Sequence, residues 1–436
     1  MKIVVHPNRR FLMRGDGAPF FYLADTAWEL FHRLTFDEAD LYLQTRAAQG
    51  FNVIQAVALD ELDGLDVPSA GGHTAFFNRD PARPNEAYFA HIDRVVRRAN
   101  ELGLAVALLP TWGDKWNKKW GRGPEIFTPE NARAYGRWIA ARYRGADLIW
   151  VLGGDRPVEN DAHRAIINAM GEGVREGCGG EQLITFHPVG SERSSQYFHN
   201  APWLDFNMAQ TGHRRNAPNY RFVEGDYALQ PVKPCMDGEP GYEAMFDNFN
   251  RANGWLTDFD ARRAAWWAVL SGAFGHTYGC NAVWQFFDAR RDPVLCPVQT
   301  WREALQLPGA NQMRHVKNLM ESLPFFTRRP APEIILNNPS EEHLRAVAST
   351  DATPDKSDGT YIVAYIPFAD SVQTLAFDLT PLQNTNLTAA WHNPRTGEQL
   401  EPFDVVRSPS ETFRPPLRVS PLDWVLVVRF LECGSE

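Results

Sequence analysis

Two acidic residues stand where buried strands should end. Residues 148–152 form a continuous apolar run that stops at two glycines, after which Asp155 and Arg156 follow. Residues 232–238 lead in a similar way to Glu239, which lies in a Gly-Glu-Pro-Gly turn. A protonated carboxyl can protonate a leaving oxygen and an ionised one can attack an anomeric carbon, so two such groups are the minimum for cleaving a glycosidic bond. We predict that Asp155 and Glu239 form this pair.

The spacing leaves two rivals of Glu239 open. Asp237 lies two residues earlier, and on an extended strand its side chain would point to the same side as that of Glu239. Glu243 follows in the same segment. Arg156 is adjacent to Asp155, so on an extended strand it should point away from Asp155. We therefore expect its guanidinium to reach Glu239 and keep that carboxylate ionised.

Further aromatic and polar residues follow the other predicted strands. Aromatic rings can stack on sugars, whereas carboxylates, amides and imidazoles can bind hydroxyl groups. Each Trp could instead pack in the core, and each His could instead be structural or orient a carboxylate. With Arg156, the predicted substrate-binding residues are Asp25, Trp28, Trp112, Asp114, Trp116, His187, Gln210 and Trp284, and His213 is a further candidate.

These residues need a scaffold that brings several strand ends together. Apolar runs alternate with helical patterns in eight strand–helix units, which is typical of a (β/α)8 TIM barrel with its chemistry at the carboxyl ends of the strands. Thr35 and Glu38 predict a capping box for a helix over residues 35–49. We expect an eighth strand over residues 275–284 and a closing helix over residues 299–323. Residues 1–19 predict a β-hairpin.

The sequence changes character after the predicted barrel. Residues 328–332 read as a proline-containing linker, and short alternating runs separated by turns follow. We predict a barrel over residues 1–326 and a small antiparallel β-sandwich over residues 327–436. Residues 362–366 are apolar at successive positions, so both faces of that strand should be buried. We expect this domain to brace the barrel.

Composition and motifs exclude several classes of function. The 436 residues carry a net charge of −9, which disfavours nucleic acid and anionic membranes as partners. No His-x-His pair opens the first strand, and we expect no metal or cofactor. Serine-hydrolase and phosphate-binding glycine motifs are lacking. The five cysteines form no CxxC pair, so we expect free thiols. No apolar run approaches 18 residues, and the first ten residues lack the apolar segment of a signal peptide. We therefore expect a cytoplasmic protein, or a periplasmic or secreted one if a signal peptide has been removed, and the oligomeric state stays open.

Four segments together resemble the apiosidase-like glycoside hydrolases of family 140, and the likeness covers about residues 5–325. The segments are residues 21–28, 110–116, 150–156 and 237–243. The resemblance implies a barrel in which Asp155 is the acid/base and Glu239 the nucleophile, hence a retaining enzyme. Long loops at strands two, three and six favour a pocket over an open groove, so we expect exo action. It also implies release of apiose or another pentose from a plant glycan or glycoside, such as pectin. The C-terminal part resembles a small β domain labelled as collagen-binding. The alternative is a non-catalytic carbohydrate-binding protein.

Overall fold

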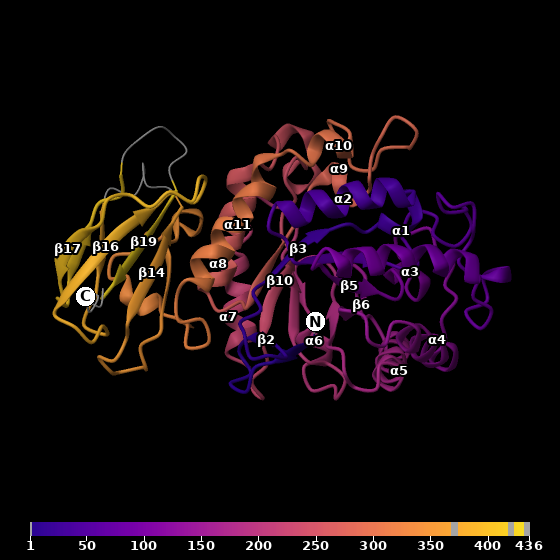
Figure 1. Ribbon diagram of the computed structural model, residues 1–436, viewed down its shortest axis with the longest axis horizontal. Coiled ribbons are helices and arrows are strands. Elements are labelled where there is room, and N and C mark those ends of the chain that lie inside the picture. The colour runs from indigo at the N-terminus through magenta and orange to yellow at the C-terminus, as the bar shows by residue number, and fades with distance from the viewer. Residues whose placement is uncertain (1, 368–373, 417–422, 431–436) are drawn as a thin grey trace.

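The computed structural model describes residues 2–367, 374–416 and 423–430. Eight parallel strands form a nearly closed barrel surrounded by helices, and an antiparallel β domain lies beside α8 and α11 (Figure 1). The predicted α/β fold is confirmed. The barrel strands are β3 (Tyr22–Thr26), β4 (Val53–Val57), β5 (Ala105–Leu109), β6 (Leu148–Gly153), β7 (Ile184–His187), β9 (Asn207–Gln210), β10 (Cys235–Glu239) and β11 (Gly275–Tyr278).

The barrel strands are buried along their whole length, and β5 and β6 accordingly read as continuous apolar runs. Helices follow most of them and cover the outside of the barrel. Thr35 and Glu38 form the predicted capping box of α2. The outer helices are α2 (Phe36–Ala48), α3 (Glu86–Glu101), α4 (Pro129–Arg142), α5 (Asp161–Gly177), α7 (Asn219–Tyr227), α8 (Asp258–Leu270) and α11 (Pro308–Glu321).

The barrel closes incompletely between β7 and β9. These strands share no ladder, and instead the short strand β8 (Glu192–Arg193) pairs antiparallel with β9. The backbone amide of Asp205 donates to the carbonyl of Ile184 at 2.8 Å, and the hydroxyl of Thr185 donates to the carbonyl of Phe206 at 2.7 Å. These two hydrogen bonds join the edges near the beginning of the strands.

Two predicted elements are divided differently in the structure. The expected eighth strand ends at Tyr278, and a short helix α9 (Asn281–Trp284) follows it. The expected helix over residues 299–323 is two helices, α10 (Trp301–Ala304) and α11. Pro308 occupies the first turn of α11, where its missing N–H needs no partner, and there it starts a new helix. Two further short helices are α1 (Leu30–Arg33) and α6 (Ser195–Phe198).

The predicted N-terminal hairpin is confirmed as β1 (Ile3–Val5) paired with β2 (Leu12–Arg14). Between its strands, Arg9 donates from Nε to the carbonyl of Val232, just before β10 begins. The hairpin therefore lies at the amino ends of the barrel strands, opposite the end at which Asp155 and Glu239 lie.

The C-terminal domain consists of a six-stranded antiparallel sheet and a two-stranded sheet. Strand β14 lies inside the larger sheet, between β13 and β19. The larger sheet runs in the order β12 (Arg329–Pro330), β13 (Val347–Thr350), β14 (Tyr361–Ile366), β19 (Trp424–Arg429), β16 (Asn386–His392) and β17 (Phe403–Val406), and the smaller pairs β15 (Leu375–Phe377) with β18 (Glu411–Phe413).

Strand β14 is buried on both faces, as its sequence predicts. Tyr361, Val363 and Tyr365 join the hydrophobic core of the barrel. The intervening residues Ile362, Ala364 and Ile366 belong to the core of the C-terminal domain. One strand therefore contributes to two cores, because successive side chains point to opposite sides of a sheet.

A buried ion pair joins the same two parts of the chain. The Asp423 carboxylate accepts from Arg262 of α8, with Nε–Oδ2 at 2.7 Å and Nη2–Oδ1 at 2.9 Å. The hydroxyl of Tyr365 donates to Oδ2 at 2.9 Å. Arg262 and Asp423 are both almost fully buried. The pair is satisfied only while the C-terminal domain is packed against α8.

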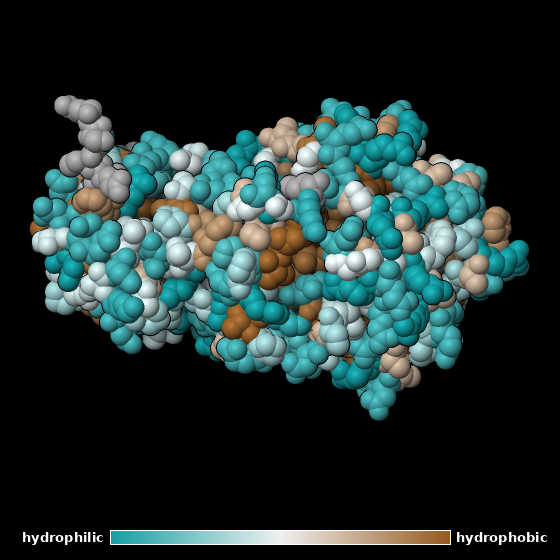
Figure 2. All heavy atoms as spheres, turned by 60° about the horizontal axis from the view of Figure 1, so that its bottom comes forward, coloured by the Kyte–Doolittle hydropathy of each residue, from teal (hydrophilic) through white to brown (hydrophobic). Residues whose placement is uncertain are grey.

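The described residues contain no helix that is both long and apolar enough to cross a membrane. On the face that Figure 2 shows, hydrophilic residues dominate and the hydrophobic ones form small separate patches. Cys178, Cys235, Cys280 and Cys296 are free thiols, as expected, and Cys433 lies outside the described residues.

Substituting Asp423→Ala should strongly destabilise the protein, because it removes the carboxylate that accepts from Nε and Nη2 of the buried Arg262 and leaves only Nη1 paired, with Asp258. Losing one partner of a buried pair costs about 3–5 kcal/mol. The matched control is Asp66→Ala, which breaks the exposed pair between Asp66 and Arg79 and should cost less than about 1 kcal/mol. Denaturant unfolding of the full chain measures both. Equal losses in the two variants would contradict the bracing role of Asp423.

Candidate active site

An unusual backbone turn after β6 positions Asp155. Gly153, Gly154 and Asp155 have positive φ angles of 97°, 100° and 51°. A Cβ atom on Gly154 would lie 2.7 Å from the backbone nitrogen of Gly113. Only glycine fits there, since real Cβ atoms do not approach backbone so closely. Non-glycine residues such as Asp155 are uncommon at positive φ. Residues with a strained backbone of this kind occur preferentially at functional sites.

Glu239 is separated from its rival Asp237 by a β-bulge. Asp237 pairs with Ala209 and Glu239 with the next residue, Gln210, so Gly238 is the extra residue in β10. The bulge breaks the alternation of side chains, and Asp237 and Glu239 have different surroundings. Asp237 accepts hydrogen bonds from Thr211 and from the side-chain amide of Asn219, at 2.8 Å and 3.1 Å. Its carboxylate is thus occupied away from the pocket.

The second rival, Glu243, is also occupied by the protein itself. Its Oε2 accepts a hydrogen bond from the hydroxyl of Tyr278, and its Oε1 accepts one from the backbone amide of Gly309. Burial raises the pKa of Glu243 to about 7. Neither rival is among the residues that line the pocket.

Asp155 and Glu239 both line one pocket of about 630 Å³ at the carboxyl ends of the barrel strands. Residues at or just after the ends of all eight barrel strands contribute to its wall. In strand order, one from each is Trp28, Glu61, Trp112, Asp155, Val189, Gln210, Glu239 and Trp284.

Two imidazoles hold the Glu239 carboxylate. Nε2 of His187 lies 2.8 Å from Oε2, and Nε2 of His213 lies 3.2 Å from Oε1. Burial acts to raise the pKa of Glu239, but the interactions with His187 and His213 outweigh it and lower the pKa to about 2. Glu239 is therefore ionised across the whole range in which the protein would work.

Asp155 has the opposite environment. Burial and the negative charge of Glu239 raise its pKa to about 6, although the nearby cation of Arg156 and the side chain of Gln210 act to lower it. Its carboxyl therefore holds a proton at mildly acidic pH while Glu239 is charged. Two carboxyls in one pocket with separated pKa values can differ in protonation state at one pH, which is what acid/base chemistry requires.

The expectation for Arg156 was wrong. Its Nη1 lies 3.3 Å from Oδ2 of Asp155, and its Nη2 donates to Oε1 of Glu61 at 2.6 Å. The expectation assumed an extended strand, in which neighbouring side chains diverge. The positive φ of Asp155 bends the chain at this point, so the two side chains lie together instead.

Three predicted substrate-binding residues are used inside the protein. Asp25 is buried and accepts from Nε of Arg46 at 2.7 Å. Asp114 is buried against Lys115 and the backbone amide of Gly123, at 2.7 Å and 2.8 Å. The indole of Trp116 is buried and donates to the carbonyl of Gly153 at 3.2 Å. These side chains support the strand ends, and none lines the pocket.

The remaining predicted aromatic residues do meet at the pocket. Trp28, Trp112 and Trp284 line it. The Trp28 and Trp112 rings lie 5.0 Å apart, and both pack against the ring of His187, at 5.4 Å and 5.9 Å. His187 lies behind Glu239 and does not line the pocket, so it positions the carboxylate.

Several residues around the pocket were not predicted. The hydroxyl of Tyr242 hydrogen-bonds to Glu239 and accepts from Nε1 of Trp28 at 3.0 Å. Trp120, half-exposed at the rim, lies over the guanidinium of Arg156 at 4.5 Å. Tyr242 lies three residues after Glu239 in the sequence, and this closeness was the signal that could have suggested a contact with the Glu239 carboxylate. Trp120 lies within a long loop, and the sequence does not show where a side chain of such a loop will lie relative to the pocket.

A second hollow of about 650 Å³ lies on the outside of the barrel, beside α5 and α6. Its acidic residues Glu172 and Glu176 both pair with Arg133. Neither follows a barrel strand, so this hollow lacks the opposed carboxyls of the strand-end pocket.

The chain is similar to known proteins along nearly its whole length. Residues 6–327 match the family described as "Apiosidase-like, catalytic domain", and residues 330–429 match the one described as "Putative collagen-binding domain of a collagenase". A solved structure described as "Glycoside hydrolase" is 31% identical, with 98% of this chain and 96% of that chain covered and a TM-score of 0.85. A family 5 glycoside hydrolase from Bacteroides vulgatus ATCC 8482 is 30% identical, with 98% and 93% covered and a TM-score of 0.87. A search of curated proteins finds no match.

Replacing Gly154 by alanine should damage both the fold and the site. A positive φ costs alanine about 1–2 kcal/mol, and the contact with the Gly113 backbone adds about 1–3 kcal/mol because backbone cannot move aside cheaply. Gly145→Ala is the matched control, since Gly145 has a φ of 89° but open space around its Cβ position. Thermal unfolding of the two variants measures the difference. If Gly145→Ala were as destabilising, close packing at Gly154 would not be what requires glycine.

Proposed function

Because the chain belongs to the apiosidase-like glycoside hydrolases, we propose that it releases a terminal sugar, apiose or another pentose, from a plant-derived glycan or glycoside. Asp155 acts as acid/base and Glu239 as nucleophile, with retention of configuration. The observation that carries this assignment is the opposed environment of the two carboxyls in one pocket, with the pKa of Asp155 raised to about 6 and that of Glu239 lowered to about 2.

In the first step, Asp155 donates its proton to the glycosidic oxygen while Glu239 attacks the anomeric carbon. The bond to the leaving group breaks, the protonated leaving group departs and a glycosyl ester forms on Glu239. His187 and His213 hold the attacking carboxylate by its two oxygens, and Tyr242 contacts it as well. These contacts restrict its rotation and keep it ionised.

In the second step, the ester itself changes the acidity of Asp155. Esterification removes the negative charge of Glu239, which is one of the two causes that raise the pKa of Asp155. The pKa of Asp155 therefore falls, and the group becomes a base that accepts a proton from water. The water oxygen attacks the anomeric carbon, and the bond from that carbon to the Glu239 oxygen breaks. The free sugar leaves, Glu239 is a carboxylate again and Asp155 carries the proton taken from water.

The shape of the pocket supports action on chain ends. Residues from the ends of all eight barrel strands line a pocket of about 630 Å³, which suits one terminal sugar unit better than a long chain. The rim carries the exposed side chains of Trp120, Phe249 and Leu295, which suit the neighbouring group of a substrate. A terminal sugar would enter, and the leaving group would lie against this rim.

Glu239→Gln should lower kcat on the best substrate by several orders of magnitude without unfolding the protein, because an amide cannot form the ester. The substrate comes from a screen of aryl glycosides that includes the apioside and the arabinofuranoside. Asp237→Asn is the matched control, and it should retain most of the activity because Asp237 does not line the pocket.

Near-normal turnover by Glu239→Gln would remove Glu239 from the reaction. Sugar binding without hydrolysis of any glycoside would instead favour the non-catalytic alternative.

Arg156→Met should move the basic limb of the pH–rate profile to higher pH. Activity requires protonated Asp155, so it falls as pH rises through the pKa of that group. Arg156 lowers this pKa, and its removal raises it. Arg122→Met is the matched control: it removes a cation that lines the pocket but pairs with Asp63, and it should leave the limb in place. The profile of kcat/KM is the measurement, and an unmoved or lowered limb in Arg156→Met would contradict this role.

A further inference from the structure

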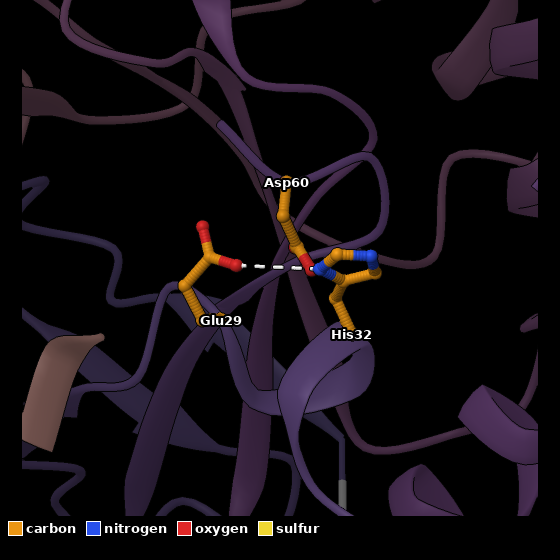
Figure 3. Close-up of side chains that lie close together, drawn as sticks. All are labelled: Glu29, His32 and Asp60. Atoms are coloured by element: carbon orange, nitrogen blue, oxygen red, sulfur yellow. Dashed lines mark ion pairs between the residues drawn. The ribbon is translucent and has the colours of Figure 1, made fainter. Parts of the chain in front are cut away.

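Three side chains that could bind a metal lie together beside the pocket wall. Glu29 and His32 belong to the segment around α1, directly after β3, and Asp60 lies in the loop after β4. One potential ligand atom from each lies within 4.8 Å of the others. The three side chains point toward one another (Figure 3). Glu29 and Asp60 are fully buried, and His32 is 6% exposed.

The tautomer of His32 follows from its surroundings. Its Nε2 lies 3.0 Å from the backbone carbonyl of Val67, which can only accept a hydrogen bond. Nε2 therefore carries a proton, and in the neutral ring Nδ1 presents a lone pair. Nδ1 lies 3.6 Å from Oε2 of Glu29. Both atoms are then hydrogen-bond acceptors, so neither can satisfy the other. Histidines that bind metals typically donate their other ring N–H to a carbonyl in this way.

The atoms that face one another are otherwise unsatisfied. Oε2 of Glu29, Nδ1 of His32 and both carboxylate oxygens of Asp60 have no hydrogen-bond partner among the described residues. The backbone N–H of His32 acts to lower the pKa of Asp60, but its geometry does not meet that of a hydrogen bond to either carboxylate oxygen. Oε1 of Glu29 is held by the backbone amide of Leu62 at 3.1 Å. A buried polar atom without a partner is unfavourable, so four of them around one point indicate a missing ligand or proton.

Two cations lie near the cluster, and neither fills it. Nε of Arg33 is 3.6 Å from Oε2 of Glu29, and its Nη1 donates to the carbonyl of Gln285. Lys115 donates to the backbone carbonyl of Asp60 and to the carboxylate of Asp114. Burial and the charge of Glu29 hold the pKa of Asp60 well above its usual range. The cluster can be neutralised by a proton on Asp60 or by a bound cation.

We propose that Glu29, His32 and Asp60 bind a divalent transition-metal ion such as Zn²⁺ or Mn²⁺. One imidazole nitrogen with two carboxylates suits such ions, whereas Ca²⁺ prefers oxygen ligands alone. Ligands about 2.1 Å from a tetrahedral metal lie about 3–4 Å apart, and Nδ1 of His32 is 3.6 Å from Oε2 of Glu29. Small shifts of side chains would bring the third ligand to this spacing.

The site would be structural, and it would fix part of the pocket wall. Asp60 is followed by Glu61, which binds Arg156, and by Leu62, and both Glu61 and Leu62 line the pocket. Trp28 precedes Glu29 and also lines it. The ion would join the loop after β4 to α1. No metal was expected from the sequence, because its first barrel strand is not followed by a His-x-His pair. The available signal was Glu29 and His32 at helical i,i+3 spacing.

The test uses the full chain after removal of metals with a chelator. Zn²⁺, Mn²⁺ and Ca²⁺ are added separately and followed by calorimetric titration, elemental analysis and thermal unfolding. We expect one equivalent of Zn²⁺ or Mn²⁺ to bind and to raise Tm, because a ligand that binds only the folded state stabilises it.

Glu29→Gln and Asp60→Asn should each abolish stoichiometric binding. Asp226→Asn should retain it, since Asp226 is a buried carboxylate outside the cluster that pairs with Ser195 and Arg193. If a cluster variant does not fold, the titration of the wild-type chain still decides. Absence of stoichiometric Zn²⁺ or Mn²⁺ binding to the wild type would overturn the proposal and favour a proton on Asp60. Undiminished binding by both folded variants, or binding of Ca²⁺ alone, would also overturn it.

Discussion

The contact of two imidazoles with one carboxylate is the interaction on which the pocket depends. His187 comes from the end of β7, His213 from the loop after β9 and Glu239 from the end of β10, so only a barrel with its strand ends side by side brings them together. The two imidazoles keep Glu239 charged despite its burial. That charge in turn raises the pKa of Asp155. The opposite pKa shifts of the two carboxyls thus arise from one local arrangement.

Backbone geometry is the second constraint. At β6, two glycines with positive φ allow the chain to pass close to Gly113 and His187. At β10, a bulge at Gly238 separates Glu239 from Asp237. Both devices redirect a carboxyl at a strand end without disturbing the buried ladder behind it. The C-terminal domain supports the same barrel from outside, since β14 shares in its core and Asp423 binds Arg262.

Much of this could be predicted because strand ends and apolar patterns are local signals. The alternation of strands and helices indicates the barrel, and residues 362–366 indicate a strand with two buried faces. Asp155 and Glu239 were placed together by the same logic. Asp25, Asp114 and Trp116 stand at strand ends too, but Arg46, Lys115 and the carbonyl of Gly153 occupy them. Which partner a side chain meets depends on distances in the folded structure, and these are not visible in the sequence. The path of Arg156 depends on one φ angle, which sequence does not reveal.

In the proposed mechanism, the charge of Glu239 keeps Asp155 protonated. The direct measurement is the pKa of the Asp155 carboxyl, followed by carbon-13 resonance or infrared absorption of the labelled group, with Asp155→Asn to assign the signal. The wild type should titrate with a pKa of about 6. In Glu239→Gln the neutral amide no longer disfavours ionisation of its neighbour, so the pKa of Asp155 should fall. An Asp155 pKa that stays unchanged or rises in that variant would contradict the account.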